Sequence, residues 1–466
     1  MPSQEKGESE DIQLSSKVMR VEPIQTNPYD FVARLRSTWL GQVYTNHLKY
    51  YTLVRLIAHW IWRNGYPFYI NNISTQLYNK EAKRWRSLIK LREFARKRTI
   101  LKYKLADAAL VEIPVPKVFP TCDQSCLVSS SNRYTFPEIY VATINNAMTY
   151  GGTNLILADG EVICHDLYDF KRDYTSEELH GRTLIAPKLR RIRWLLHDKT
   201  PEQITAAATF VDACALNYAH WITEVLPRVI LFCAEERFRS VPIVVNDGLH
   251  KNIMESLLLV AGTEREIITL PIGRALAVDT LYVTSVAGYV PFERRTNKFL
   301  GHSHGMFNPR PLDMLRNHMY GWGQKTKDQA SPEKIFLRRN SGTRKVTNTA
   351  ELEKLLVTRG YIIVEPERLT FLQQIQLFKN AKEIVALTGA ALSNAIFCQP
   401  GTHVAILMAK HENMIYRYWL NMLAPLKVRV FYVLGDIVKH HDLGIHGDFS
   451  VNASDLIDLL EVFDNK

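Results

Sequence analysis

The sequence is poor in cysteine, and its few cysteines show no pattern typical of a metal site. The 466 residues include six cysteines, and none of them forms a Cys-x-x-Cys pair. Cys122 and Cys126 are four positions apart, but no second pair accompanies them. Reduced thiols in a cytoplasmic protein are the simpler interpretation. A chain of this length buries a large core, so its stability needs no disulfide or metal.

The sequence also lacks any run of about 18 uncharged apolar residues, so we expect no transmembrane helix. The nearest candidate is YYTLVRLIAHWIW (residues 50–62), which Arg55 and His59 interrupt. That pattern is typical of an amphipathic or buried helix. The first residues, MPSQEKGESEDIQLSS, are polar and acidic and do not resemble a signal peptide. We therefore expect residues 1–28 to form a disordered tail and the protein to be cytoplasmic.

Acidic residues are scarce in one basic segment. The chain has 58 Lys and Arg against 47 Asp and Glu, and the excess of 11 is unevenly distributed. Residues 80–104 contain eleven Lys and Arg against two Glu. Apolar residues recur at helical spacing within this segment, namely Trp85, Leu88, Leu91, Phe94 and Ala95. We predict a basic helical region over residues 29–106.

A basic amphipathic helix at residues 80–104 has three interpretations. It could lie on an anionic membrane surface, bind nucleic acid, or form a solvated surface that packs through its apolar stripe. No zinc-finger, helix-turn-helix or RNP-type pattern occurs, so we expect no nucleic-acid partner. The membrane contact and the plain surface helix both stay open, and the former would make the protein peripheral at the inner face of a membrane.

Beyond the basic segment the pattern changes to strands and then to alternating strands and helices. β-rich runs with Gly-Gly and Asp-Gly turns fill residues 138–170, and GQKTKDQASPEK (residues 323–334) has the composition of a linker. After the linker, short apolar strands alternate with amphipathic helices, which indicates βαβ units and a parallel sheet. We predict an α/β fold with two Rossmann-like domains facing a cleft, over residues 107–330 and 331–466.

The second domain has neither a Walker A loop nor a Gly-x-Gly-x-x-Gly motif, but it has another candidate phosphate site. EIVALTGAALSNAIF (residues 383–397) is a strand, a turn of small residues and a helix. Gly389, Ala390 and Ala391 would let a phosphate approach the backbone, and a helix N-terminus offers free N–H groups. Alternatively, the small residues only let the helix pack closely on the sheet.

A cationic strand end in the same domain supports the phosphate interpretation. In IFLRRNSGTRKVTN (residues 335–348), Arg338 and Arg339 follow a strand, and Arg344 and Lys345 follow a Ser-Gly turn. Arginine forms bidentate, charge-assisted bonds to phosphate oxygens. A charge run alone is usually a solvated loop, but beside the Gly-Ala-Ala turn it indicates one shared anion.

The first domain carries a polar stripe on an apolar helix, LNYAHWITEVLPRV (residues 216–229). Asn217, His220 and Glu224 are three and four positions apart, so they share a face of the helix. A histidine with a carboxylate one turn later can orient a substrate hydroxyl and accept its proton. The competing interpretation is a partly buried His–Glu pair that only holds the helix to its neighbour.

No Asp-x-Asp sequence occurs, although metal-dependent sugar transferases commonly bind Mn²⁺ or Mg²⁺ through such a pair. Two histidine pairs, His302 with His304 and His440 with His441, lack a third carboxylate at motif spacing. We expect no metal site.

These segments resemble glycosyltransferase family 61, in which similar segments occur in the same order. NYAHWITE resembles the family's Asn-x-x-His-x-x-x-Asp/Glu segment, and RRNSGTRKVTN is similar to its Arg-rich strand and turn. VEPERLTFLQQIQLFKNAKEIVALTGAALSN (residues 364–394) resembles its most recognisable stretch. The similarity covers about residues 140–410. Many members have a His where this chain has Thr388, which implies a different donor sugar or a weaker donor contact.

The resemblance implies a GT-B fold and inverting transfer from a nucleotide sugar, usually without a metal. Glu224 would be the general base, with His220 positioning the acceptor or supporting Glu224, and Asn217 orienting His220. The donor would contact Arg338, Arg344, Lys345, Thr388 and the backbone of Gly389 and Ala390, with Glu365 at the ribose or bracing the loop and Asn348 in support. No cofactor is implied beyond the nucleotide-sugar substrate.

We therefore predict an inverting, metal-independent glycosyltransferase of surface polysaccharide biosynthesis, such as capsule, exopolysaccharide or lipopolysaccharide assembly. Its partners would be a nucleotide-sugar donor and a glycan or lipid-linked acceptor. Two alternatives remain. One is a non-catalytic nucleotide-sugar or glycan-binding protein of the same fold. The other is a metal-dependent hydrolase built on the two histidine pairs.

Overall fold

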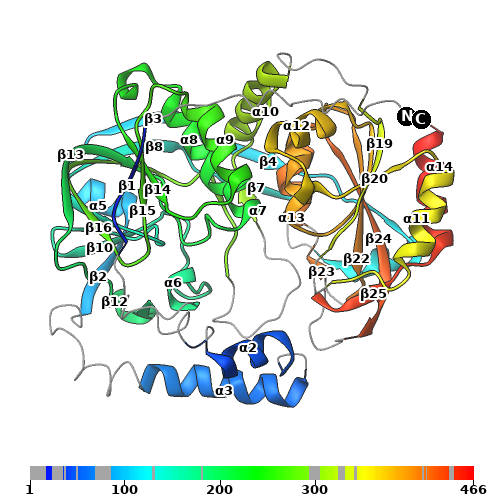
Figure 1. The fold of residues 1–466 in the computed structure, drawn as a ribbon, viewed down its shortest axis with the longest axis horizontal. Helices are drawn as coiled ribbons and strands as arrows, with labels where there is room; N and C mark the ends of the chain where they lie inside the picture. The colour runs from blue at the N-terminus through cyan, green and yellow to red at the C-terminus, as the bar shows by residue number, and fades with distance from the viewer. Residues whose placement is uncertain are drawn as a thin grey trace, which may run out of the picture.

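The protein has two large sheets in one mixed α/β structure (Figure 1). A computed structural model describes residues 17–23, 35, 38–48, 51–68, 85–128, 132–179, 182–292, 305–323, 331–340, 344–411, 414–415, 417–439 and 446–465. The predicted α/β class is confirmed. Within these ranges, no helix has both the length and the apolar character needed to cross a membrane.

The first sheet has four parallel strands at its centre, and the chain connects them in a doubly wound order. Its strand order is β1 (Val18–Arg20), β15 (Ile267–Leu270), β14 (Ile243–Asn246), β13 (Glu202–Thr209), β16 (Ala275–Thr284), β8 (Ile139–Tyr150), β9 (Ile156–Ala158), β10 (Glu161–Cys164), β2 (Trp85–Lys90), β12 (Arg191–Trp194) and β11 (Thr183–Ala186), and β3 (Lys102–Ala106) pairs with β8. From β13 the chain moves outward through β14 and β15 and then returns to β16, on the other side of β13, with all four strands parallel. The carboxyl ends of β13 and β16 therefore flank a topological switch point, where ligands bind in open α/β sheets.

The second sheet repeats this arrangement. Its order is β20 (Ile362–Val364), β19 (Lys334–Leu337), β21 (Glu383–Leu387), β22 (His403–Ala409), β24 (Arg429–Lys439) and β25 (Asp448–Ser450), and β5 (Lys117–Phe119) pairs with β24. Every neighbouring pair is parallel except β24 with β25. The first five strands follow the 2-1-3-4-5 order of a doubly wound sheet, with its switch point between β19 and β21.

Helices cover these sheets, and short strand pairs complete the structure. The first part has α5 (Leu91–Lys97), α6 (Ser176–Leu179), α7 (Tyr218–His220), η6 (Trp221–Val225), α8 (Leu226–Cys233), η7 (Glu236–Phe238), α9 (Lys251–Ala261) and α10 (Pro309–Gly323). The second has α11 (Thr349–Thr358), η8 (Pro366–Arg368), α12 (Phe371–Asn380), η9 (Ala390–Phe397), α13 (Arg417–Leu423), η10 (Ala424–Leu426) and α14 (Ala453–Asp464). The remaining elements are α2 (Trp39–Asn46), α3 (Thr52–Phe68), η4 (Thr121–Cys126), η5 (Pro187–Leu189) and the strand pairs β4 (Ala109–Glu112) with β7 (Arg133–Phe136), β6 (Leu127–Val128) with β23 (Met414–Ile415), and β17 (Gly288–Tyr289) with β18 (Met306–Phe307).

Local sequence signals set several of these boundaries. The capping box predicted for α12 is present, because Thr370 and Gln373 each accept a hydrogen bond from the other's backbone N–H. Helix α9 ends at Gly262, whose φ of 77° is a conformation that favours glycine. The helix predicted after the Gly389 turn is instead the 3₁₀ helix η9.

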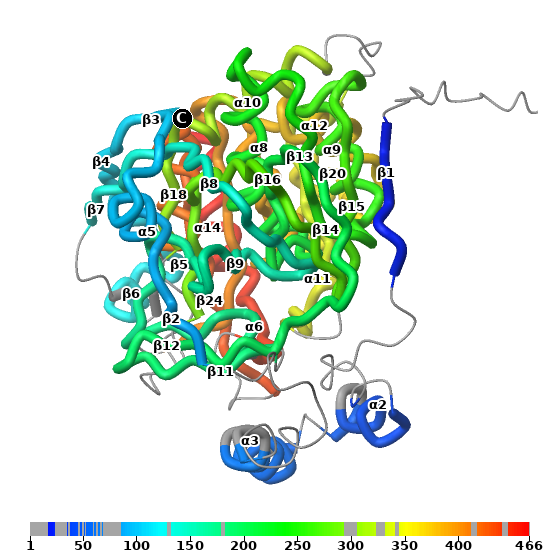
Figure 2. Tube along the Cα trace, turned by 90° about the vertical axis from the view of Figure 1, so that its left-hand side faces the viewer, coloured from blue at the N-terminus to red at the C-terminus, as the bar shows by residue number. Residues whose placement is uncertain are grey.

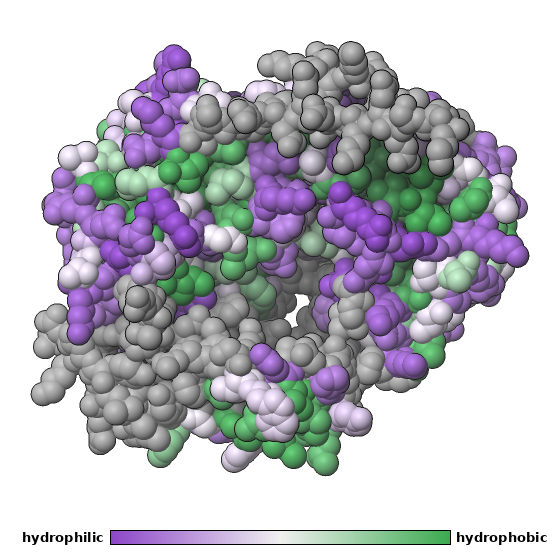
Figure 3. All heavy atoms as spheres, in the orientation of Figure 1, coloured by the Kyte–Doolittle hydropathy of each residue, from purple (hydrophilic) through white to green (hydrophobic). Residues whose placement is uncertain are grey.

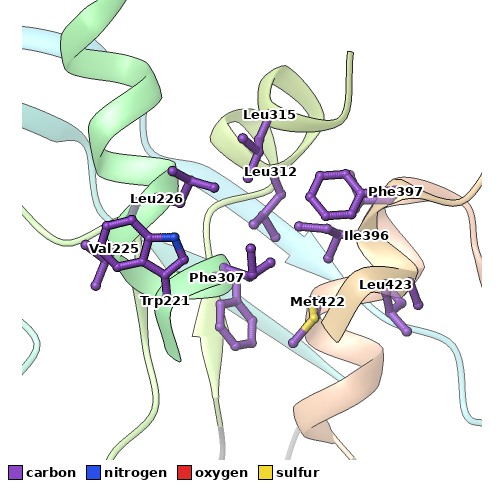
Figure 4. Packing of buried hydrophobic residues seen from close by; sticks show 14 of the residues in the cluster. Trp221, Val225, Leu226, Phe307, Leu312, Leu315, Ile396, Phe397, Met422 and Leu423 are labelled. Atoms are coloured by element: carbon purple, nitrogen blue, oxygen red, sulfur yellow. The ribbon is translucent and has the colours of Figure 1, made fainter. Parts of the chain in front are cut away.

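One hydrophobic core joins the two halves of the molecule (Figure 4). It brings together side chains from the helix after β13, from α10, and from η9 and α13, including Trp221, Val225, Leu226, Leu312, Leu315, Ile396, Phe397, Met422 and Leu423. Fully burying a side chain of this kind contributes about 1.5–3 kcal/mol, so this packing fixes how the halves face each other.

The basic helical region predicted over residues 29–106 contains the helices α2, α3 and α5, but the prediction is wrong at two strands. Residues 85–90 form strand β2 and residues 102–106 form β3, and only α5 between them is helical. Leu88 is buried because β2 pairs with both β10 and β12, so sheet pairing overrides the helical periodicity. Many of the cations also have acidic partners: Arg98, for example, lies 2.6 Å from carboxylate oxygens of both Asp159 and Glu161.

The prediction of a disordered tail over residues 1–28 is wrong for its described part. Strand β1 lies beside β15 at the edge of the first sheet (Figure 2). Arg20 makes two hydrogen bonds to Asp247, of 2.8 and 3.1 Å, and Val21 is fully buried. Strand pairing, the Arg20–Asp247 hydrogen bonds and the burial of Val21 therefore order this segment, although the polar sequence around it predicts disorder.

The cysteines are unpaired, as predicted. All six lie in the described ranges and are free, including Cys122 and Cys126 in η4. In the described part of the chain, no three His, Cys, Asp or Glu side chains cluster as metal ligands would. The histidine pairs His302–His304 and His440–His441 lie outside the described residues.

Candidate functional site

A pocket of about 620 Å³, counting the part open to solvent, lies at the switch point of the first sheet. Its walls come from the segments after β10, β13 and β16 and from the helix that begins at Tyr218. The residues that line the pocket include Asn154, His165, Tyr168, Tyr174, Asp212, His220, Glu224, Arg228, Tyr289 and Phe292. The mixture of aromatic and polar groups is typical of small-molecule and cofactor sites.

The helix carrying His220 and Glu224 is interrupted by the π-helical turn η6. Pro227 follows this turn and has no N–H to donate, and the Arg228 side chain instead donates from Nε to the carbonyl of Glu224 at 3.0 Å. A Cβ added to Gly288 would lie 2.5 Å from the carbonyl oxygen of Thr223, so only glycine fits beside the turn. Single π turns within α-helices occur frequently at functional sites.

Asn217 begins this helix. Its side-chain oxygen accepts a hydrogen bond of 3.0 Å from the backbone N–H of Ala219. Asn217 is therefore an N-cap, a position that asparagine favours, and it positions His220 through the helix backbone.

His220 and Glu224 form a hydrogen-bonded pair in the pocket. His220 Nδ1 contacts Glu224 Oε1, while Glu224 Oε2 accepts from the backbone N–H of Val290 at 3.2 Å. Burial would lower the pKa of His220, but the Glu224 and Asp212 carboxylates outweigh burial, and the net pKa is raised above 6.5. Each carboxylate oxygen keeps a second lone pair for a ligand hydroxyl.

A buried ion pair lies beside this dyad. Arg228 Nη2 and Asp212 Oδ2 are 3.0 Å apart, and both side chains line the pocket. Asp212 also accepts from the Cys214 N–H at 2.9 Å, and its own N–H donates to Asn246 Oδ1 at 2.9 Å. These bonds fix the loop between β13 and the His220 helix.

His165 is a pocket residue that the sequence analysis missed. It follows β10 directly, and no spacing to another polar residue marks it. Its ring centroid lies 4.4 Å from that of Tyr289, and burial lowers its pKa to about 4, so the imidazole is neutral. Within the described structure its Nδ1 is buried without a hydrogen-bond partner.

On the other side of the site, the Arg-rich strand end and the glycine turn lie together at the switch point of the second sheet. Arg339 Nη1 donates to the carbonyl of Thr388 at 3.3 Å. A Cβ on Gly389 would lie 2.2 Å from the same nitrogen. A side chain at this turn would therefore displace the end of the Arg339 guanidinium. Burial lowers the pKa of Arg339.

Arg344 is a second partly buried cation near Arg339. Burial, with the nearby charge of Arg339, lowers its pKa to about 10. In the described structure no carboxylate forms an ion pair with Arg344. A buried charge without a counter-charge is costly, so this arrangement favours an anionic ligand.

The other predicted donor residues have different surroundings. Arg338 lies 2.5 Å from Glu353 and 3.3 Å from Glu365, so its charge is already compensated. Glu365 also pairs with Arg368 at 2.5 Å, which places it in this ion-pair network at the end of β20.

The last two predicted donor-side residues contact the C-terminal segment. Lys345 is exposed, and its backbone N–H donates to Asp448 at 2.9 Å. The Asn348 side chain makes hydrogen bonds of 2.8 and 3.2 Å to the backbone of Val451. By contrast, Arg339 contacts the Gly389 turn, and Arg344 lies near enough to Arg339 for that charge to lower its pKa.

The two sides of the site face each other. Tyr218, next to His220, donates from its hydroxyl to Asn394 of η9 at 2.6 Å. Tyr418 of α13 lies near both Glu224 and Arg344. Burial is the main cause of its raised pKa, Glu224 adds to that effect, and Arg344 opposes it.

The model of the family described as Glycosyltransferase 61 matches residues 218–405. Residues 218–405 are thus similar to glycosyltransferase family 61. The match begins just before the His220–Glu224 pair and includes Arg344 and the Gly389 turn. It indicates a glycosyltransferase. A comparison with curated proteins finds no match.

The glycosyltransferase 61 segment does not include the whole site. His165, Tyr168 and Asp212 precede it, and Tyr418 follows it. Part of the pocket wall therefore comes from outside the matched segment.

Proposed function

We propose that this protein is an inverting, metal-independent glycosyltransferase with a GT-B arrangement of two Rossmann-like halves. It transfers a sugar from a nucleotide-sugar donor to a hydroxyl of a glycan or lipid-linked saccharide. The observation that carries this proposal is that Tyr418 lies near both Glu224, which lines a pocket, and the partly buried Arg344. We further propose that the enzyme acts at the cytoplasmic face of the membrane, in surface polysaccharide biosynthesis.

The acid–base step belongs to the first half. The acceptor oxygen attacks the anomeric carbon of the donor, and its proton passes to the Glu224 carboxylate. His220 holds that carboxylate through Nδ1, so the proton acceptor keeps one orientation. Its Nε2 is a second base within the same pair, and the experiments below distinguish the two.

The departing diphosphate belongs to the second half. As the bond between the anomeric carbon and the phosphate oxygen breaks, the electron pair leaves with the diphosphate. Arg339 and Arg344 offset its charge, and backbone N–H groups after Gly389 approach its oxygens. Two preorganised guanidinium groups supply here the charge stabilisation that a divalent cation provides in other transferases.

The pocket wall outside the family segment suits the acceptor. Tyr168 and Tyr174 offer aromatic surface for the C–H face of a sugar, and the neutral His165 offers a hydrogen bond to a hydroxyl. The acceptor hydroxyl is then held beside Glu224, as proton abstraction requires.

The test is transfer by the purified full chain from a panel of nucleotide sugars, after a thermal-shift screen selects donors that raise the melting temperature. We expect transfer with inverted anomeric configuration that persists in excess EDTA. Donor binding without any turnover would favour a non-catalytic binding protein. Hydrolysis that EDTA abolishes would favour the metal-dependent hydrolase.

A further inference from the structure

Helices α2 and α3 lie together outside the two sheets (Figures 1 and 2). They expose large apolar side chains, whereas such side chains elsewhere in the described structure are mostly buried. Hydrophobic residues are visible on this lower part of the molecule in Figure 3. The most exposed are Trp39 (74%), Leu40 (68%), Leu53 (70%), Leu56 (59%), Ile57 (51%), Trp60 (67%), Ile61 (54%) and Phe68 (61%).

The exposed residues of α3 form one continuous face. Positions 53, 56, 57, 60, 61 and 68 recur with the three- and four-residue spacing that places side chains in one stripe of a helix. Val54, Arg55 and Ala58 point to the other side and are half-buried. The helix therefore presents a stripe of large apolar side chains outward, unlike a helix packed on a soluble core.

The charge around these helices has one sign. Residues 31–80 contain no Asp or Glu and six Lys or Arg. Neither α2 nor α3 has an acidic residue in its first turn. An apolar face rich in tryptophan, flanked by basic residues without acidic ones, has the composition of a helix that lies in the interface of an anionic bilayer.

The length of α3 agrees with an interfacial orientation. Its 17 residues span about 26 Å at about 1.5 Å per residue. That is shorter than the hydrocarbon thickness of about 30 Å, and Arg55 and Asn64 lie within the helix. The helix is suited to lie along a membrane with its apolar face among the lipid headgroups.

We propose that α2 and α3 dock this protein onto an anionic lipid surface through the exposed side chains of Trp39 in α2 and of Leu53, Leu56, Ile57, Trp60 and Ile61 in α3. This surface replaces the basic segment 80–104 as the candidate membrane contact, because Arg92, Lys97, Arg98 and Lys104 of that segment pair with acidic side chains. The proposal does not depend on the glycosyltransferase activity, and it would bring the site to lipid-linked substrates.

The test is flotation of the full chain with vesicles of phosphatidylcholine alone or mixed with phosphatidylserine. We expect binding to the mixed vesicles, weaker binding at high salt, and at least tenfold weaker binding for the double variant Leu56→Ser/Trp60→Ser. Leu189→Ser is the matched control, because Leu189 is 72% exposed on the body of the protein. Its binding should equal that of the wild type. Because all three side chains are exposed, we expect unchanged melting temperatures.

Three results would overturn the proposal. One is an absence of wild-type binding to either vesicle. Another is equal binding by the double variant and the wild type. The third is a wild-type dimer in light scattering, without lipid, that the double variant converts to a monomer, since the face would then be covered by a second copy of the chain.

Discussion

The loop after β13 and the loop after β19 each leave a parallel strand at a switch point, yet they carry opposite charges. The first leads to Asp212 and Glu224, and the second to Arg339 and Arg344. In the first, each carboxylate has a basic partner, Arg228 or His220. In the second, Arg344 is partly buried with no ion pair in the described structure. Carboxylates that already have basic partners suit an acid–base function that needs no further charge. A cation without an ion pair suits the binding of an anionic part of the substrate.

The substitution Glu224→Gln tests the role of the first loop most directly and should have the largest effect. We expect kcat to fall by ~10²- to 10⁴-fold, because the proton acceptor is lost. Donor binding should stay unchanged, since Glu224 lies on the acceptor side. Initial rates and donor titration measure both quantities. Exposed Glu236→Gln is the control and should retain full activity, whereas undiminished turnover in Glu224→Gln would remove Glu224 as the base.

The next largest effect is expected for Arg344→Gln. Removing a preorganised cation at the leaving group should lower kcat/KM by ~10²- to 10³-fold. Arg338→Gln is the matched comparison, because Arg338 is already compensated by Glu353 and Glu365. That variant should lose only a few-fold in rate and show a lower melting temperature. The reverse order of rate effects would mean that Arg338 contacts the donor.

Gly389→Ala tests the contact between the turn and Arg339. The added Cβ must displace the guanidinium, and misplacing a substrate-binding group by about 1 Å can cost on the order of 10²-fold in rate. We expect weaker donor binding by calorimetry and a roughly tenfold to hundredfold loss of rate. Gly321→Ala is the control, because no atom lies within 4 Å of the new Cβ. A Gly389→Ala enzyme with normal donor affinity would contradict the arginine–glycine arrangement.

The smallest effect is a shift of pH dependence. The raised pKa of His220 means that the imidazole becomes protonated at a higher pH than an ordinary histidine would. Below that pH Nε2 no longer accepts a proton, and the Glu224 carboxylate beside an imidazolium is a weaker base. Activity should therefore fall on acidification through a pKa above 6.5. In Glu224→Gln the remaining activity should fall at lower pH, because the carboxylate that raises the His220 pKa is gone.

A pH profile of kcat/KM for the wild type and for His220→Asn completes this test. The asparagine variant should lack the acidic limb if His220 causes it. An identical limb in both enzymes would assign the titration to another group and leave Glu224 alone as the proton acceptor.

The α/β class, the parallel second sheet, the α12 capping box and the end of α9 could all be predicted, because each depends on local periodicity or on one capping residue. The spacing of His220 and Glu224 was also sufficient to place them on one face. Local patterns failed at residues 85–104, where Leu88 is held by strands distant in sequence. They also missed His165, which only the packing of β10 against the loop after β16 brings into the pocket.

The sequence by itself determined which residues could bear charge and which segments could become strands or helices. Only the tertiary structure decided which charges remain uncompensated: Arg338 and Arg344 lie six positions apart in one cationic stretch, but Glu353 and Glu365 reach only the first. The reason is that electrostatic free energy depends on distances between groups and on their burial, and both are set by long-range packing rather than by neighbours along the chain.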